Sequence, residues 1–110
     1  MFIVEKKPKS AAAESYRTLR TNIQYSSFDK EYRTIAVTSS EPGEGKTTTS
    51  VNLAFALSQG EGKVLLVDCD MRKPSIHKAF RVSNESGLTD LLLHKKTMEE
   101  VMVKYDESLT

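Results

Sequence analysis

Residues 43–47 read Gly-Glu-Gly-Lys-Thr, a combination of types that can bind the phosphates of a nucleotide. Glycines let the backbone curl with its N–H groups pointing inward, because no β-carbon obstructs that shape. Lys46 can reach the β- and γ-phosphates, and the hydroxyl of Thr47 can bind Mg²⁺. These residues therefore predict a site for a nucleoside triphosphate and its magnesium ion.

The candidate phosphate-binding loop extends beyond these five positions. Thr48 follows directly, and we expect it near the α-phosphate. Ser40 stands where the usual Gly-x4-Gly-Lys-Thr pattern has its first glycine, but a small residue is retained, so we expect binding to persist. The predicted cofactor-binding residues are Pro42, Gly43, Glu44, Gly45, Lys46, Thr47 and Thr48.

Two aspartates follow the apolar segment at 64–67. Ligands of open α/β sheets bind beyond the carboxyl ends of the strands, so Asp68 is expected to point into such a crevice, with Asp70 on the same side. There Asp68 can hold Mg²⁺ or accept a proton. Lys46, Asp68 and Asp70 are the predicted catalytic residues, and Thr47 and Asp68 the predicted metal ligands. The alternative is a strand-ending turn with two solvated acids.

The elements that would position these residues form a strand, loop, helix and second strand. Residues 34–39 are β-branched and apolar, which favours a strand. The segment at 64–67 is apolar without alternation, which is typical of a strand covered on both faces in a parallel sheet. Between them a helix is predicted to begin near Lys46, with a buried face made of Val51, Ala54, Phe55 and Leu57.

The flanking segments are predicted to be an arm and several short helices. Residues 1–9 are expected to form an extended arm, and Ser10 to cap a helix over 11–25 with an apolar stripe of Tyr16, Leu19 and Ile23. After the second strand we expect a loop, then short helices within 87–93 and 97–105. The second of these helices starts with a capping box of Thr97 and Glu100.

The predicted fold class is α/β, a P-loop NTPase-like, doubly wound and mainly parallel sheet with flanking helices. Two strands do not complete such a sheet, and exposed parallel edges are unstable. We therefore expect residues 1–110 to be the N-terminal part of one larger α/β domain, or to need a partner; a compact mini-domain is the alternative. Its parts are an arm with a helix (1–32), a βαβ unit (33–68) and a loop with short helices (69–110).

The composition indicates which partners and which cellular compartment to expect. The net charge of +1 provides no general basic field, so no nucleic-acid partner is expected. The single cysteine, Cys69, excludes an intramolecular disulfide and fits a reducing cytoplasm. The N-terminus lacks the pattern of a signal peptide, and no apolar run approaches the length of a membrane span.

Three motifs in order give a resemblance to a known family. The segments "SSEPGEGKTT" at 39–48 and "VLLVDCDMRKP" at 64–74 resemble the Walker A and Walker A′ motifs of bacterial tyrosine kinases of capsule and exopolysaccharide synthesis, the BY-kinases. Their fold is related to the MinD and ParA ATPases. Glu14, Arg17 and Arg20 match the Glu-x-x-Arg-x-x-Arg motif of that family. The resemblance covers nearly the whole chain.

The resemblance implies an autophosphorylating protein-tyrosine kinase that uses ATP and Mg²⁺ and regulates polysaccharide synthesis and export. It implies that Lys46 and Thr47 bind ATP and Mg²⁺, and that Asp68 and Asp70 serve the metal and the incoming tyrosine. Glu14, Arg17 and Arg20 would lie at a subunit interface of a ring-shaped homo-oligomer. From the residues alone, this triplet is a solvated helix face with one ion pair.

The chain also resembles the Firmicutes-type arrangement of this family. That arrangement implies a separate cytoplasmic kinase at the inner face of the plasma membrane. There it is activated by a membrane-anchored adaptor of the polysaccharide co-polymerase type, and its substrates are tyrosine-bearing proteins, including itself. The Walker B strand and the C-terminal tyrosine cluster of the family would lie beyond residue 110. Tyr16, Tyr25, Tyr32 and Tyr105 are scattered and do not replace that cluster.

Two other functions remain open from the sequence. A MinD/ParA-like partition ATPase would carry a lysine five residues before the Lys46 position, where this chain has Glu41, which argues against that activity. A catalytically inert nucleotide-binding fragment is the third possibility, because no Walker B segment is present among the 110 residues. The activity of this chain alone is therefore left undecided.

Overall fold

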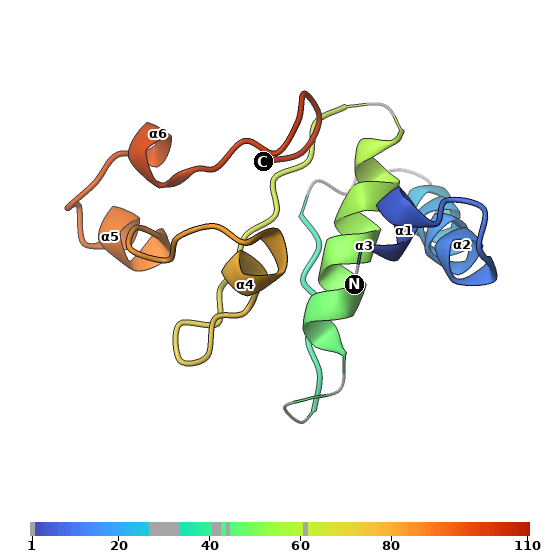
Figure 1. Cartoon of the computed structure of the whole chain (residues 1–110), viewed down its shortest axis with the longest axis horizontal. Helices are drawn as coiled ribbons and strands as arrows, with labels where there is room; N and C mark the ends of the chain where they lie inside the picture. The colour runs from blue at the N-terminus through green and yellow to red at the C-terminus, as the bar shows by residue number, and fades with distance from the viewer. Residues whose placement is uncertain (1, 27–33, 41–42, 44, 61) are drawn as a thin grey trace. The chain divides into compact units, whose positions relative to one another are not determined.

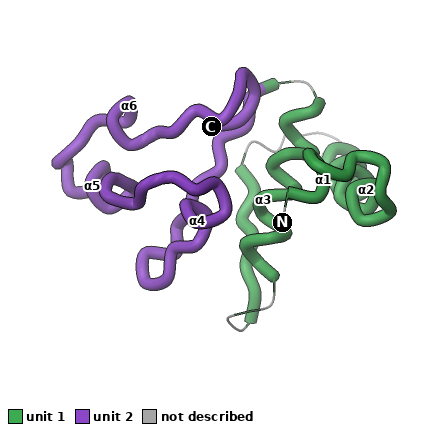
Figure 2. The backbone as a smooth tube through the Cα atoms, in the orientation of Figure 1, with its two compact units in different colours: residues 1–62 green, residues 63–110 purple. Residues whose placement is uncertain are grey.

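The computed structural model describes residues 2–26, 34–40, 43, 45–60 and 62–110. These residues form six helices, in the chain order α1 to α6 (Figure 1). The chain divides into two compact units, residues 1–62 and 63–110 (Figure 2). None of the helices in the described residues has the length and apolar character needed to cross a membrane.

Unit 1 is built from three helices with α3 at its centre. The helices α1 (Ile3–Lys6) and α2 (Ala11–Tyr25) contact each other and α3 (Lys46–Ser58). Every residue of α3 from 51 to 56 is buried, because neighbours cover more than one side of the helix. The predicted burial of Val51, Ala54 and Phe55 is confirmed, whereas Leu57 is only half-buried.

The bounds of α2 are those predicted for it. The hydroxyl oxygen of its N-cap, Ser10, accepts a hydrogen bond from the Ala13 N–H at 3.1 Å, which satisfies one of the free donors of the first turn. The predicted apolar stripe is only partly correct. Tyr16 and Ile23 are half-buried, but Leu19 is 38% exposed.

The prediction that residues 1–9 form an extended arm was wrong, because they contain the short helix α1. A four-residue helix has little stability of its own, so contacts with α3 must hold it. The side chain of Val4 is fully buried, and its N–H donates to Asn52 Oδ1 at 3.1 Å. The rings of Phe2 and Phe55 pack at a centroid distance of 5.1 Å. The segment is therefore structured by tertiary packing.

Unit 2 contains three short helices, α4 (Ile76–Phe80), α5 (Leu88–Leu92) and α6 (Met98–Val101). The predicted capping box of α6 is confirmed: Glu100 Oε1 accepts from the Thr97 N–H at 3.1 Å, and Thr97 Oγ1 accepts from the Glu100 N–H at 3.4 Å. The helix ends earlier than predicted. A turn follows it, in which Asp106 Oδ1 accepts the N–H groups of Ser108 and Leu109 at 2.7 and 2.8 Å.

Two segments of unit 2 pair in parallel. Val64 and Leu109 form a parallel β-bridge, the Val64 N–H donates to the Ser108 carbonyl at 2.7 Å, and the Leu66 N–H donates to the Thr110 carbonyl at 2.8 Å. Residues 64–66 thus have a parallel partner, but it is 108–110, and the pairing predicted with the strand at 34–39 stays a prediction. The predicted coverage on both faces is absent. Leu65 and Val67 are 53% and 46% exposed.

The segment at 34–39, where a strand was predicted, is not part of a regular strand in the residues that the structure describes. A strand needs a neighbour to satisfy its N–H and C=O groups, so the local β-propensity of this segment does not suffice. The complete doubly wound sheet therefore stays a prediction.

Candidate nucleotide-binding site

The two glycines of the predicted phosphate loop have the backbone conformation for which glycine is suited. Gly43 and Gly45 both have φ of +81°, in the left-handed region. A Cβ at either position would meet nothing within 4 Å, so backbone geometry, and not crowding, explains the residue type. Pro42 and Glu44, which belong to the same prediction, lie outside the described residues, as does Glu41.

The loop leads directly into α3, as predicted. Gly45 is the N-cap, and its carbonyl accepts the first helical hydrogen bond from the Thr49 N–H at 2.9 Å. Lys46, Thr47 and Thr48 are half-buried in the first turn. This turn contains no acidic residue, so the positive end of the helix dipole is not compensated there. The start of α3 is therefore suited to bind an anion such as a phosphate.

Asp68 binds backbone N–H groups of unit 2 with both of its oxygens. Oδ1 accepts from the Asp70 N–H at 3.0 Å, and Oδ2 accepts from Ser75 and Ile76 at 3.0 and 3.2 Å. Ile76 is the first residue of α4. The carboxylate thus closes the loop at 69–75 and satisfies donors at the start of that helix. It is half-buried, not a solvated acid.

Asp70 organises the turn inside the same loop. Its Oδ1 accepts from the N–H groups of Arg72 and Lys73 at 3.2 and 3.0 Å. The side chains of Arg72 and Lys73 are exposed, whereas Asp70 is half-buried. The turn that was the alternative interpretation of the sequence is thus present in the structure. Its two acids, Asp68 and Asp70, accept hydrogen bonds from backbone N–H groups. The catalytic roles of Asp68 and Asp70 stay predictions.

The residues present fit a magnesium ion held mainly by nucleotide phosphates. Within the described ranges, no group of three or more His, Cys, Asp or Glu side chains could hold a metal. Mg²⁺ is commonly bound through one or two carboxylates together with substrate phosphates and water. A threonine hydroxyl and an aspartate carboxylate are ligands of these types, and the joint role of Thr47 and Asp68 as metal ligands stays a prediction.

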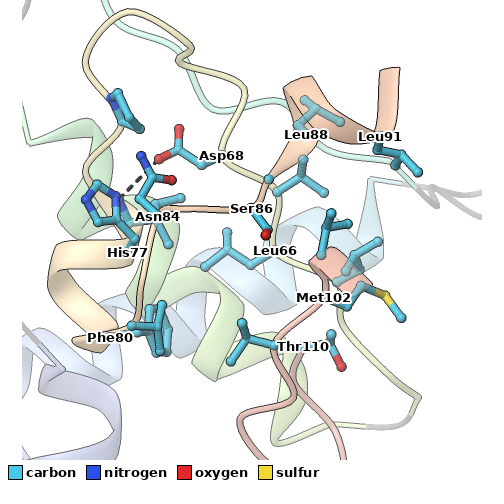
Figure 3. Close-up of a pocket in the computed structure, with 18 of the residues that line it drawn as sticks. Leu66, Asp68, His77, Phe80, Asn84, Ser86, Leu88, Leu91, Met102 and Thr110 are labelled. Atoms are coloured by element: carbon cyan, nitrogen blue, oxygen red, sulfur yellow. Dashed lines mark hydrogen bonds between the residues drawn. The ribbon is translucent and has the colours of Figure 1, made fainter. Parts of the chain in front are cut away.

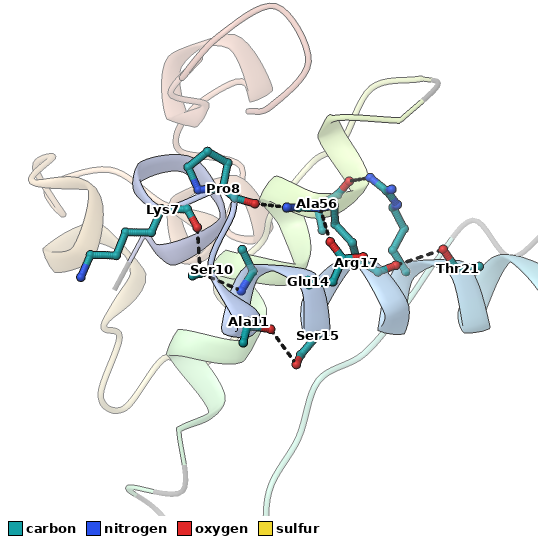
Figure 4. Close-up of polar contacts among 11 residues, drawn as sticks. Lys7, Pro8, Ser10, Ala11, Glu14, Ser15, Arg17, Thr21 and Ala56 are labelled. Carbon is teal, nitrogen blue, oxygen red and sulfur yellow. Dashed lines mark hydrogen bonds and ion pairs between the residues drawn. The ribbon is translucent and has the colours of Figure 1, made fainter.

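The three residues of the predicted interface motif make contacts within the chain (Figure 4). Arg17 Nε lies 3.4 Å from Glu14 Oε2, and Arg17 Nη2 donates to the Pro8 carbonyl. Arg20 Nη1 donates to the Ala56 carbonyl of α3 at 2.6 Å. The Glu14 side chain is 70% exposed, but that of Arg17 is only 22% exposed. Of the three residues, only Glu14 therefore matches the alternative interpretation of a solvated helix face. The interface role of the triplet stays a prediction.

Unit 2 also contains a pocket of about 490 Å³ that sequence reasoning missed (Figure 3). Its walls are mainly apolar, and Asp68, His77 and Ser86 are among the residues that contribute polar groups. The Nδ1 atom of His77 is buried and has no hydrogen-bond partner in the structure as described. No motif indicated this pocket, because its lining comes from three short helices, the loops between them, and the segments before α4 and after α6.

Together, the left-handed glycines, the lysine and the helix N-terminus define a P-loop nucleotide-binding protein. A family profile described as "AAA domain" matches residues 32–109. The chain belongs to this AAA domain family and has a P-loop NTPase-like fold.

Comparison with curated proteins shows similarity to bacterial tyrosine-protein kinases, which confirms the resemblance inferred from the sequence. The chain is 48% identical over 100 residues to the tyrosine-protein kinase YwqD of Bacillus subtilis (strain 168), covering 91% of this chain and 42% of that protein. It is 38% identical over 97 residues to the putative tyrosine-protein kinase CapB of Staphylococcus aureus, covering 88% and 42%. It is 35% identical over 101 residues to the tyrosine-protein kinase Etk of Escherichia coli (strain K12), covering 92% and 14%.

A solved structure is similar to this chain. The crystal structure of the chimerical protein CapA2B2 superimposes with a TM-score of 0.92 and 40% sequence identity, over 98% of this chain and 48% of that chain. This chain thus spans less than half the length of the relatives that it matches.

Proposed function

We propose that this chain is the nucleotide-binding part of an ATP-dependent protein-tyrosine kinase. The observation that carries the proposal is the loop and helix at 43–48, where two left-handed glycines lead into a helix that begins at Lys46 and has no acid in its first turn. Such a site binds phosphates through backbone N–H groups and the lysine. The named activity of the relatives supports transfer of the γ-phosphate to tyrosine.

Each predicted site residue has a role in this proposal. Lys46 binds the β- and γ-phosphates, and the N–H groups at 43–48 bind the remaining phosphate oxygens. Thr47 and Asp68 provide ligands for Mg²⁺, which neutralises charge on the phosphates. Asp70 lies beside Arg72 and Lys73 in one tight turn and serves the incoming tyrosine.

We further propose the setting that the resemblance implies. The kinase acts in capsule or exopolysaccharide synthesis and works in the cytoplasm, at the inner face of the plasma membrane. A membrane-anchored adaptor activates it, its substrates are tyrosine-bearing proteins including itself, and it forms a homo-oligomeric ring through the helix with Glu14. The exposure of the Glu14 side chain supports the last point, because this carboxylate is accessible to a second subunit.

A lysine substitution tests the nucleotide site. The Lys46→Met change should weaken the binding of ATP·Mg²⁺ by at least about tenfold, because the lysine is the main cation on the β- and γ-phosphates. Isothermal titration calorimetry measures this. Lys63→Met, at an exposed lysine of unit 2, is the matched control and should leave binding unchanged. Equal affinity in Lys46→Met and the wild type would refute the site.

A second experiment separates the three candidate functions. The full-length protein is incubated with ATP·Mg²⁺ and the cytoplasmic tail of the adaptor, and phosphotyrosine and released phosphate are both measured. Phosphotyrosine that is absent from Lys46→Met supports the kinase. Phosphate release without phosphotyrosine indicates a partition-type ATPase, and binding without either product indicates an inert nucleotide-binding protein.

A further inference from the structure

We propose that Arg20 is a positioning residue for the nucleotide site, because it caps the C-terminal end of α3. This helix carries the phosphate-binding residues at its other end. The inference rests on the proposed nucleotide-binding function. It adds a role inside the subunit to the interface role that the resemblance implies for Arg20.

The contact satisfies a carbonyl group that the helix itself leaves free. The last four carbonyls of a helix have no donor within the helix, and Ala56 is among these in α3. Gly60 has the N–H group four residues further on, but this group donates to the Leu57 carbonyl at 3.2 Å. Arg20 Nη1 supplies a donor to Ala56 instead, at 2.6 Å and in a part-buried position.

The charge of the guanidinium also suits this end of the helix. The C-terminus of an α-helix carries a partial negative charge, which a cation stabilises. The last turn of α3 contains no basic residue of its own. Arg20, reaching across from α2, therefore provides a positive charge that the sequence of α3 lacks. Partial burial reduces the screening of this interaction by solvent.

The position of Arg20 is itself fixed by α2. Ser10 caps this helix, and Arg17, one turn before Arg20, donates to the Pro8 carbonyl (Figure 4). The α3 helix is thus held at its C-terminal end from α2 and at its middle by the hydrogen bond between Asn52 and Val4. Because a helix of this length is stiff, anchors on its body also fix the direction of its N-terminus.

The experiment compares three variants of the full-length protein with the wild type. Arg20→Met removes the donor and the charge, and Arg20→Lys keeps both. Ala13→Gly is the matched control, since it weakens α2 at a fully buried position and leaves Arg20 in place. Affinity for ATP·Mg²⁺ is measured by calorimetry at a concentration where light scattering shows one subunit. Amide hydrogen exchange is measured at Gln59 and Gly60.

We expect Arg20→Met to weaken nucleotide binding about threefold to tenfold and to speed amide exchange at Gln59 and Gly60, as loss of a helix-terminal charge contact of this strength implies. Arg20→Lys should restore most of the affinity. Ala13→Gly should lower the melting temperature and retain the affinity.

Several results would overturn this role. One is an unchanged affinity for ATP·Mg²⁺ in Arg20→Met when the wild type binds. This result overturns the role even if the variant has lost its oligomeric state. Another is an equal loss of affinity in Ala13→Gly, or no recovery in Arg20→Lys, since either points to general destabilisation. Failure of the wild type to bind ATP·Mg²⁺ refutes the proposed function instead. Exchange at Gln59 and Gly60 then decides whether Arg20 caps α3.

Discussion

The side chain of Asn52 joins the N-terminal segment to the phosphate-loop helix, since its Oδ1 accepts a hydrogen bond from the Val4 N–H at 3.1 Å. Its Nδ2 donates to the Thr48 carbonyl at 2.9 Å, one turn earlier in α3. Asn52 and Val4 are both fully buried. A buried amide that satisfies both of its ends in this way connects the start of the chain to the nucleotide site.

The Asn52→Ala change should lower the free energy of unfolding by about 1–3 kcal/mol, because it leaves the buried Val4 N–H without an acceptor. Urea denaturation followed by circular dichroism measures this. Asn22→Ala is the matched control at an exposed position of α2 and should change stability by less than about 0.5 kcal/mol. Similar stabilities for the two variants would show that the hydrogen bond contributes little.

The N-cap of α2 provides a second prediction. Ser10→Ala should cost about 1 kcal/mol, because the Ala13 N–H loses its side-chain acceptor. In Ser15→Ala the lost hydroxyl donates only to the Ala11 carbonyl, four residues earlier in the same helix. That change should be neutral or slightly stabilising, because alanine has the higher helix propensity. Thermal unfolding of both variants makes the comparison, and a larger loss in Ser15→Ala would contradict it.

The left-handed conformation of Gly45 makes a third prediction. Gly45→Ala should destabilise the protein by about 1–2 kcal/mol, because a β-carbon disfavours this region of φ. Gly45→Asn should cost less, since asparagine tolerates the left-handed conformation better. Gly87→Ala is the control: φ there is −166°, and a Cβ meets nothing within 4 Å. If Ala and Asn at position 45 cost the same, contacts and not backbone conformation would determine the effect.

The two aspartates of unit 2 should respond differently to amide substitution. Asp68 accepts N–H groups with both oxygens, so the amide of Asp68→Asn must place a donor against a donor, at a cost of about 1–3 kcal/mol. Oδ1 of Asp70 accepts the N–H groups of Arg72 and Lys73, and the amide oxygen of Asp70→Asn can still accept both. Thermal unfolding should therefore separate the variants.

Kinase assays on the same variants test the proposed role of Asp70. If Asp70 serves the incoming tyrosine, Asp70→Asn should retain its melting temperature and lose phosphotyrosine formation. Loss of stability in Asp70→Asn but not in Asp68→Asn would contradict the loop geometry described above.

Local signals explain which parts of the fold could be predicted. The helix over 11–25 and the start of α3 were predictable because a cap, a periodic pattern or a glycine marks each of them within a few residues. The capping box of Thr97 and Glu100 is likewise a three-residue signal. In contrast, α1 forms only because α3 covers Val4, and no propensity of the segment itself indicates a helix.

Contacts between distant residues explain why part of the candidate site was not predicted. The type of Asp68 indicated a functional acid, but its bonds to Ser75 and Ile76 cross seven and eight residues. The contact between Arg20 and Ala56 spans 36 residues and depends on how α2 packs against α3. A motif identifies such residues without specifying their partners, which only the packed structure supplies.

The parallel pairing of residues 64–66 with 108–110 has a consequence for folding kinetics. The two paired segments lie at opposite ends of unit 2, so the whole unit forms one loop that must close before the bridge between Val64 and Leu109 exists. Closing a long loop costs entropy before any contact compensates for it, which slows folding. During synthesis on the ribosome, the helices of unit 1 can therefore assemble before Leu109 has emerged. The bridge between Val64 and Leu109 in unit 2 can form only afterwards.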